Sequence, residues 1–170
     1  PISPYAATKL AGELACHTYH HLHGLSVLAL RFFTVYGPRQ RPDLAIHKFA
    51  RLISEGRSIP MFGDGSSERD YTYIDDILQG IHASIDLLQR SEPVFEIVNL
   101  GESRTVSLRE MIQVLGEEMG VEPVVEQKPM QPGDVLRTYA DVSRAGALLG
   151  YLPSVDFREG VRGFLKWFNE

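Results

Sequence analysis

The sequence predicts an α/β fold, and two observations carry that prediction. An apolar run at residues 26–33 is bounded by Gly24 and Gly37, is too short for a helix, and is typical of a buried parallel strand. Apolar residues elsewhere recur at helical spacing, as at 44–54 and 75–88, with short extended stretches between these segments. The 170 residues suffice for one domain with a substantial core.

Glycines and hydrophobic periodicity place the elements along the chain. Gly24, Gly56, Gly120 and Gly150 each follow a helical pattern and are expected to end it. The expected elements are, in order, a helix at 5–23, a strand at 26–33, a helix at 44–54, extended segments at 58–62 and 69–73, a helix at 75–88, a strand at 95–100, a helix at 108–120, an extended segment at 124–126, and helices at 143–150 and 157–168.

Polar residues at the helix starts indicate caps. Ser107 and Asp156 are each followed three residues later by Glu, which is the capping-box pattern. Asp43, Asp75 and Ser143 stand just before or at the start of the other helices and are expected to cap them.

Composition excludes several classes of protein. The formal net charge of −5 gives no support to binding of nucleic acid or of a membrane surface. The apolar runs are too short to span a bilayer. Cys16 is the single cysteine, so no intramolecular disulfide can form, which fits a cytoplasmic protein.

Tyr5 and Lys9 form the most informative local pattern. They lie four residues apart in a helical segment and therefore share one helix face. An ammonium group beside a phenol favours the phenolate, which suits Tyr5 to act as a base.

Three blocks in order extend this pattern: YAATK at 5–9, LRFFTVYGPR at 30–39, and GDG with RDY between 63 and 71. The series resembles the extended short-chain dehydrogenase/reductase family, the NAD-dependent nucleotide-sugar epimerases and dehydratases. The resemblance implies the C-terminal part of a Rossmann-like α/β protein with its smaller substrate-binding α/β domain. Residues 1–40 would then be a remnant of the dinucleotide-binding domain. Residues 41–170 would form mainly the nucleotide-sugar-binding domain, with some segments returning to the first.

The sequence departs from the family pattern at its start. Members open with a strand, a Gly-rich turn and a helix that hold the NAD pyrophosphate, and they place a Ser or Thr upstream of the Tyr. The sequence begins four residues before Tyr5, so both the Gly-rich unit and the catalytic Ser or Thr are expected to be missing from these residues. The expectation is therefore a truncated epimerase-like chain that is inactive alone.

The resemblance implies catalytic and cofactor roles for three residues. Tyr5, as phenolate, would remove the proton from the sugar C4 hydroxyl while NAD takes up and returns the hydride. Lys9 would assist Tyr5 and hydrogen-bond the nicotinamide ribose. Phe33 matches a position that packs near the nicotinamide. No metal is expected.

The resemblance also implies a set of residues that bind a UDP-sugar. Thr34 and Arg41 match the seven-residue spacing at which relatives that act on UDP-glucuronate contact the sugar and its carboxylate. Thr34 also follows the predicted strand, at the end where ligands gather in open α/β sheets. Phe62 flanks the uracil and Arg69 binds the diphosphate in this reading. The remaining residues of the set are Gln131, where some relatives use Arg for the diphosphate, and Asp134, which would hold the uridine ribose.

The implied activity is NAD-dependent epimerisation at C4 of a UDP-sugar through a 4-keto intermediate, with UDP-glucuronate as first choice. UDP-glucose epimerisation is the second choice, and a sugar-nucleotide dehydratase or decarboxylase the third. A different class also stays open, namely a nucleotide-sugar-binding module without turnover. The family resemblance further implies a homodimer.

Two competing motifs are set aside. Gly63-Asp64-Gly65 lacks a third glycine and precedes an extended segment, so a turn is favoured over a phosphate-binding loop. His17 and His21 lie one helical turn apart, but no further metal ligand follows at a useful spacing.

Arginines outnumber lysines by thirteen to four. The arginines in loops either bind an anionic ligand or stabilise the loops themselves.

Overall fold

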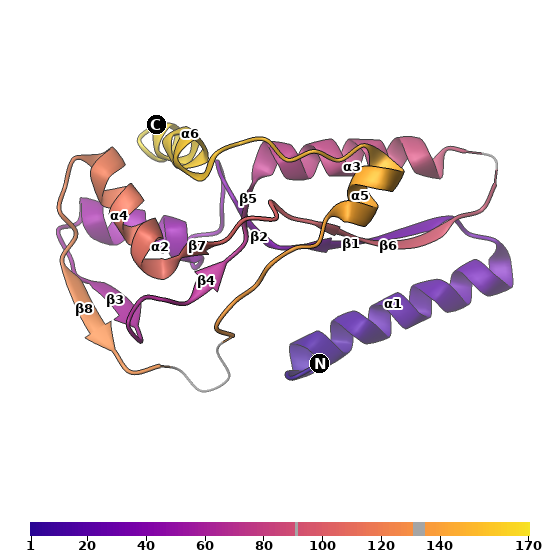
Figure 1. Cartoon of the computed structure of the whole chain (residues 1–170), viewed down its shortest axis with the longest axis horizontal. Helices are drawn as coiled ribbons and strands as arrows, with labels where there is room; N and C mark the ends of the chain where they lie inside the picture. Colours follow the sequence, from indigo (N-terminus) through magenta and orange to yellow (C-terminus); the bar gives the residue numbers. More distant parts are fainter. Residues whose placement is uncertain (91, 131–134) are drawn as a thin grey trace.

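The computed structural model describes residues 1–90, 92–130 and 135–170 (Figure 1). The helices are α1 (Pro4–His23), α2 (Ala45–Ser54), α3 (Ile74–Leu88), α4 (Leu108–Met119), α5 (Ser143–Leu149) and α6 (Phe157–Phe168). The strands are β1 (Val27–Phe32), β2 (Thr34–Tyr36), β3 (Ile59–Phe62), β4 (Glu68–Arg69), β5 (Tyr71–Tyr73), β6 (Phe95–Leu100), β7 (Val106–Ser107) and β8 (Val125–Lys128).

The strands pair in twos. β1 pairs with β6, β2 with β5 and β3 with β8, all in parallel, whereas β4 and β7 pair antiparallel. The parallel strand predicted at 26–33 is confirmed as β1, and its partner β6 arrives after the crossover helix α3. Parallel pairs joined by helices are the pattern of the α/β class, so the predicted class is confirmed.

Local chemistry explains several helix ends. Ser107 and Asp156 cap α4 and α6 as expected, since their side chains accept the backbone N–H groups of Glu110 and Arg158. Gly24 ends α1 in the left-handed conformation, at φ 64°, which only glycine adopts without strain.

Three predicted caps are wrong. The residues at the cap positions of α2 and α3 are Leu44 and Tyr73, and within the described residues neither helix has a side-chain cap. Asp43 pairs with a neighbouring arginine instead, and Asp75 lies inside the first turn of α3. Ser143 is the first helical residue of α5, and its N–H is accepted by the side chain of Asp141. For Asp43 and Ser143, a contact with a neighbouring side chain replaces the expected cap.

Two apolar clusters stabilise the chain. One lies among α2, α4 and α6 and the short strands beside them, with Tyr36, Ile46, Met111 and Phe164 almost fully buried. The other lies between the β1–β6 pair and the helices α3 and α5, and its buried members are Ile77, Val98, Leu100, Ala145 and Tyr151.

Helix α1 lies on the other side of the β1–β6 pair from α3 and α5 (Figure 1). All twenty of its residues are described, and none of them is buried. Leu14 and Leu22 are 63% and 65% exposed. In the part of the chain that the structure describes, no helix has the length and apolar content needed to cross a membrane.

Candidate functional site

Tyr5 and Lys9 lie at the start of α1, as the sequence predicts. The Lys9 Nζ lies 5.3 Å from the centroid of the Tyr5 ring, so the ammonium group is close to the phenol. Tyr5 is 70% exposed and Lys9 is also exposed, so a ligand can reach both side chains from solvent.

A groove of about 440 Å³ runs beside this pair between α1 and β1, and Tyr5, Lys9 and Cys16 line it from the helix side. Arg31, on β1, crosses the gap and donates from Nε and Nη2 to the Glu13 carboxylate at 2.6 and 2.7 Å. This two-pronged pair lowers the pKa of Glu13 and fixes α1 to the strand. The groove is thereby held open along the face that carries Tyr5.

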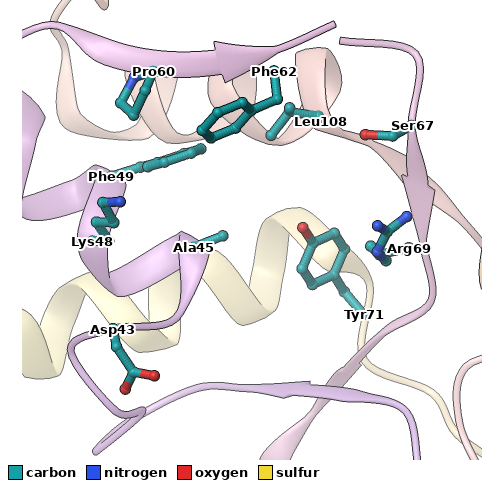
Figure 2. Close-up of a pocket in the computed structure, with 10 residues that line it drawn as sticks. All are labelled: Asp43, Ala45, Lys48, Phe49, Pro60, Phe62, Ser67, Arg69, Tyr71 and Leu108. Atoms are coloured by element: carbon teal, nitrogen blue, oxygen red, sulfur yellow. The ribbon is translucent and has the colours of Figure 1, made fainter. Parts of the chain in front are cut away.

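A second pocket, of about 230 Å³, lies between α2 and the strands β3 to β5 (Figure 2). Two of its lining residues, Phe62 and Arg69, were assigned to UDP-sugar binding from the sequence. The others are Asp43, Ala45, Lys48, Phe49, Pro60, Ser67, Tyr71 and Leu108. Segments far apart in the sequence thus meet at one site.

The lining of this pocket combines aromatic rings with cations. The rings of Phe49 and Phe62 lie together on one side, whereas Arg69 and the Tyr71 hydroxyl lie on the other (Figure 2). An apolar face suits a base ring, and a nearby guanidinium suits a phosphate. The pocket can therefore hold a nucleotide by its base and its phosphates.

Helix α2 supplies a wall of the pocket that the sequence analysis missed. Ala45, Lys48 and Phe49 are spaced three and four residues apart and share one face of α2, which is turned to the pocket. Phe49 belongs to the apolar pattern at 44–54. The same helical spacing of three and four residues, counted from Ala45, would have placed Lys48 on the face that carries Phe49. Lys48 adds a second cation to the lining.

The opposite wall is formed by β4 and β5. Arg69 donates from Nη1 to the carbonyl of Glu68 at 2.9 Å. Burial raises the pKa of Tyr71 to about 12, opposed by the charge of Arg69, so the phenol stays protonated at neutral pH. A protonated hydroxyl can donate a hydrogen bond to an anionic ligand.

Asp70 fixes the position of both these residues. Its carboxylate is fully buried and accepts the backbone N–H groups of Glu102, Ser103 and Ala140 and the hydroxyl of Thr72, at 2.8 to 3.1 Å. A buried carboxylate needs such partners to offset its desolvation. These hydrogen bonds therefore fix the backbone between Arg69 and Tyr71.

Arg41 lies in the loop before α2 and is exposed. It donates from Nε and Nη2 to Asp43 at 3.1 and 2.6 Å, and this contact raises the Arg41 pKa above its ordinary value. Arg41 is thereby held beside the pocket that Asp43 lines.

The remaining predicted residues are placed as follows. Thr34 begins β2 and stands in register with Tyr71 of the pocket wall, and its N–H donates to the carbonyl of Asp70 at 3.0 Å. Phe33 is half-buried between β1 and β2. Gln131 and Asp134 lie outside the described residues. Among the described residues, no group of three His, Cys, Asp or Glu side chains is placed to hold a metal ion.

Comparison with known proteins gives consistent matches. Residues 1–101 match the model of the NAD dependent epimerase/dehydratase family. The chain is 46% identical to an uncharacterized protein of Methanocaldococcus jannaschii and 42% identical to the UDP-glucuronate 4-epimerase of Thermodesulfobacterium geofontis. Each match covers 100% of this chain and 51% of the relative, so the chain spans about half the length of the curated relatives it matches.

Solved structures show the same relation. The UDP-glucuronic acid 4-epimerase from Bacillus cereus, in complex with UDP-glucuronic acid and NAD, matches with a TM-score of 0.92 at 37% identity, over 99% of this chain and 53% of that one. The UDP-glucose 4-epimerase from Thermotoga maritima, with UDP-glucose, gives 0.87 at 32% identity, over 99% and 54%. The chain therefore belongs to the NAD-dependent epimerase/dehydratase family, with the extended short-chain dehydrogenase/reductase fold, and matches the C-terminal part of its relatives.

Proposed function

We propose that the full-length protein is an NAD-dependent 4-epimerase of UDP-sugars, with UDP-glucuronate as its first substrate. The observation that carries the proposal is the pocket of Figure 2, in which Phe62 and Arg69 meet although they come from different strands. Relatives named as UDP-glucuronate 4-epimerases support it. The 170 residues alone would bind the UDP-sugar without turning it over.

In this proposal Tyr5 takes the proton of the sugar C4 hydroxyl. Lys9, whose Nζ lies 5.3 Å from the Tyr5 ring, places a positive charge beside the phenol. The exposed Tyr5 side chain and the groove beside it leave room for both a sugar and a cofactor. Tyr5, Lys9 and Phe33 would hold NAD, which supplies reversible oxidation at C4 when bound. The protein's own residues orient the sugar and move the proton.

The UDP moiety would occupy the pocket. Phe62 would flank the uracil, and Arg69 would pair with the diphosphate through its guanidinium group. Lys48 adds positive charge to the lining, which favours the same ligand. Gln131 and Asp134 stay in the proposed set as further diphosphate and ribose contacts.

Thr34 and Arg41 would contact the sugar itself. Arg41 is paired with Asp43, which lines the pocket, so a sugar attached to a diphosphate in the pocket would lie near Arg41. One observation favours UDP-glucose as a second candidate, because Asp43 already neutralises the Arg41 guanidinium. A neutral sugar needs no free cation at this position.

Affinities of the full-length protein for UDP-glucuronate and UDP-glucose test the assignment. Arg69→Ala should weaken both ligands alike, since the diphosphate is common to them. Arg41→Ala should weaken UDP-glucuronate selectively, by about ten- to a hundredfold, the worth of a charge-assisted hydrogen bond. Arg57→Ala is the matched control, because Arg57 is also an exposed arginine paired with an acid two residues away. Equal losses for both sugars in Arg41→Ala would reject UDP-glucuronate and favour UDP-glucose.

Assembly and domain organisation complete the proposal. We propose a cytoplasmic homodimer, supported by the exposed leucines of α1 and by the single cysteine. Residues 1–40 would belong to the dinucleotide-binding domain and 41–170 mainly to the nucleotide-sugar-binding domain. The second apolar cluster, where α3, β6 and α5 pack on β1, supports the return of later segments to the first domain.

A further inference from the structure

The ion pair of Arg41 and Asp43 occupies a distinctive place in the molecule. Asp43 lines the pocket of Figure 2, and Arg41, two residues earlier in the same loop, binds its carboxylate by two hydrogen bonds. A sugar attached to a diphosphate in the pocket would therefore lie near this pair. Asp43 is also the one carboxylate in the lining, which otherwise carries the cations Lys48 and Arg69 within the part of the chain described.

The geometry leaves Arg41 only partly engaged. Asp43 accepts hydrogen bonds from Nε and Nη2, which form one edge of the guanidinium group, at 3.1 and 2.6 Å. Arginine carries five N–H donors in a planar fork, so the edge with Nη1 can still meet a second carboxylate. Such a carboxylate would be attracted by Arg41 and repelled by Asp43.

We propose that Asp43 determines sugar specificity by neutralising Arg41, and so limits the preference of the site for an anionic over a neutral sugar. The inference rests on the proposed function, because it assigns Asp43 a role toward the sugar of a UDP-sugar. While Asp43 is ionised, sugars that carry a carboxylate or a hydroxymethyl group at this position bind with more similar affinities. Loss of the Asp43 charge increases the affinity for the sugar that carries the carboxylate.

Asp43→Asn tests the inference, because asparagine keeps the shape and an acceptor oxygen but loses the charge. Affinities for UDP-glucuronate and UDP-glucose are measured by calorimetry in the full-length protein with NAD, in a Tyr5→Phe background that blocks conversion. A unit charge at contact distance in a wet site is worth about fivefold in affinity. UDP-glucuronate should therefore bind about fivefold more tightly, with UDP-glucose unchanged.

Glu55→Gln is the matched control. Glu55 also pairs with an arginine two residues away, Arg57, at 2.9 Å, and it lies outside the pocket lining. The control loses the same charge and should change neither affinity. The gain in Asp43→Asn should also shrink in 1 M salt, where the screening length falls to about 3 Å. A purely structural role for Asp43 would not give this salt dependence.

The outcomes separate the inference from the proposed function. If Arg41→Ala weakens UDP-glucuronate selectively while Asp43→Asn changes nothing or weakens it, the role of Asp43 is overturned and the substrate assignment stands. If Asp43→Asn tightens both ligands equally, the charge acts on the diphosphate, and the sugar role is likewise overturned. If Arg41→Ala weakens both sugars equally, UDP-glucuronate is rejected and the inference with it.

Discussion

Glu102 offers a test of electrostatics inside the fold. It follows β6, and its Oε2 atom is buried with no hydrogen-bond partner in the part of the chain that the structure describes. Burial and, to a smaller extent, the charges of Asp76, Asp70 and Asp156 together raise the pKa of Glu102 to about 7, against the opposing effect of Arg104. Replacing this carboxyl group with a neutral amide should therefore stabilise the protein at alkaline pH.

The sign and size of the effect follow from linkage. The pKa of Glu102 rises from 4.5 to about 7 on folding, so the folded state binds the proton more tightly than the unfolded state between these values. The free energy of unfolding consequently falls as the pH rises from about 4.5 to about 7, and it keeps this lower value at higher pH. The full shift would correspond to about 3.4 kcal/mol, and solvent screening of this partly buried group reduces the cost to about 1–2 kcal/mol.

Urea unfolding of wild type and Glu102→Gln at pH 5 and pH 8 measures the effect. The variant should be more stable than wild type by about 1–2 kcal/mol at pH 8, and by little at pH 5. Glu122→Gln, at an exposed position, is the control and should follow wild type at both pH values. A Glu102→Gln variant whose stability parallels wild type at both pH values would refute the reasoning.

Two further predictions concern catalysis and packing. Tyr5→Phe in the full-length protein should lower kcat by about a hundred- to ten-thousandfold and leave the affinity for the UDP-sugar unchanged, because the phenol acts on a proton that moves only in the transition state. Steady-state kinetics check this, and near-normal turnover would remove Tyr5 from the mechanism. Gly160→Ala should destabilise by about 1–3 kcal/mol, because a Cβ on Gly160 would lie 2.1 Å from the Tyr36 hydroxyl. Gly12→Ala should instead stabilise by up to about 1 kcal/mol in thermal or urea unfolding, because among the described residues the new Cβ would meet no atom within 4 Å beyond its chain neighbours and the backbone of its own helix.

The parts of the fold that could be predicted are those fixed by local pattern. Apolar spacing identified β1 and the long helices, because their buried faces recur at the period of the element. Strands β4 and β7 are two residues long, and no periodicity exists over so short a stretch. They form because tertiary packing places Glu68 beside Ser107 and Arg69 beside Val106. The helix caps divide in the same way. Ser107 caps α4 as predicted, whereas the Asp43 side chain pairs with Arg41 and does not cap α2.

The candidate site divides in a similar way. Phe62 and Arg69 could be named from motifs, because each motif is contiguous in sequence. Lys48 and Asp43 could not, since their place in the pocket depends on how α2 packs against β3 and β4. Arg41 and Asp43 are only two residues apart in the sequence, yet the importance of their pairing depends on the place of Asp43 in the pocket lining, which tertiary packing determines.

Helix α6 has a consequence for synthesis of the chain on the ribosome. It supplies Phe157, Val161, Phe164 and Leu165 to the core that also contains α2, and its glycine face receives the ring of Tyr36. These residues are synthesised long after α2, so α2 and the strands beside it keep an uncovered apolar face until α6 has left the ribosome. Such intermediates aggregate readily. A stop codon before α6 would therefore be expected to yield a protein cleared by proteolysis rather than a shortened, functional one.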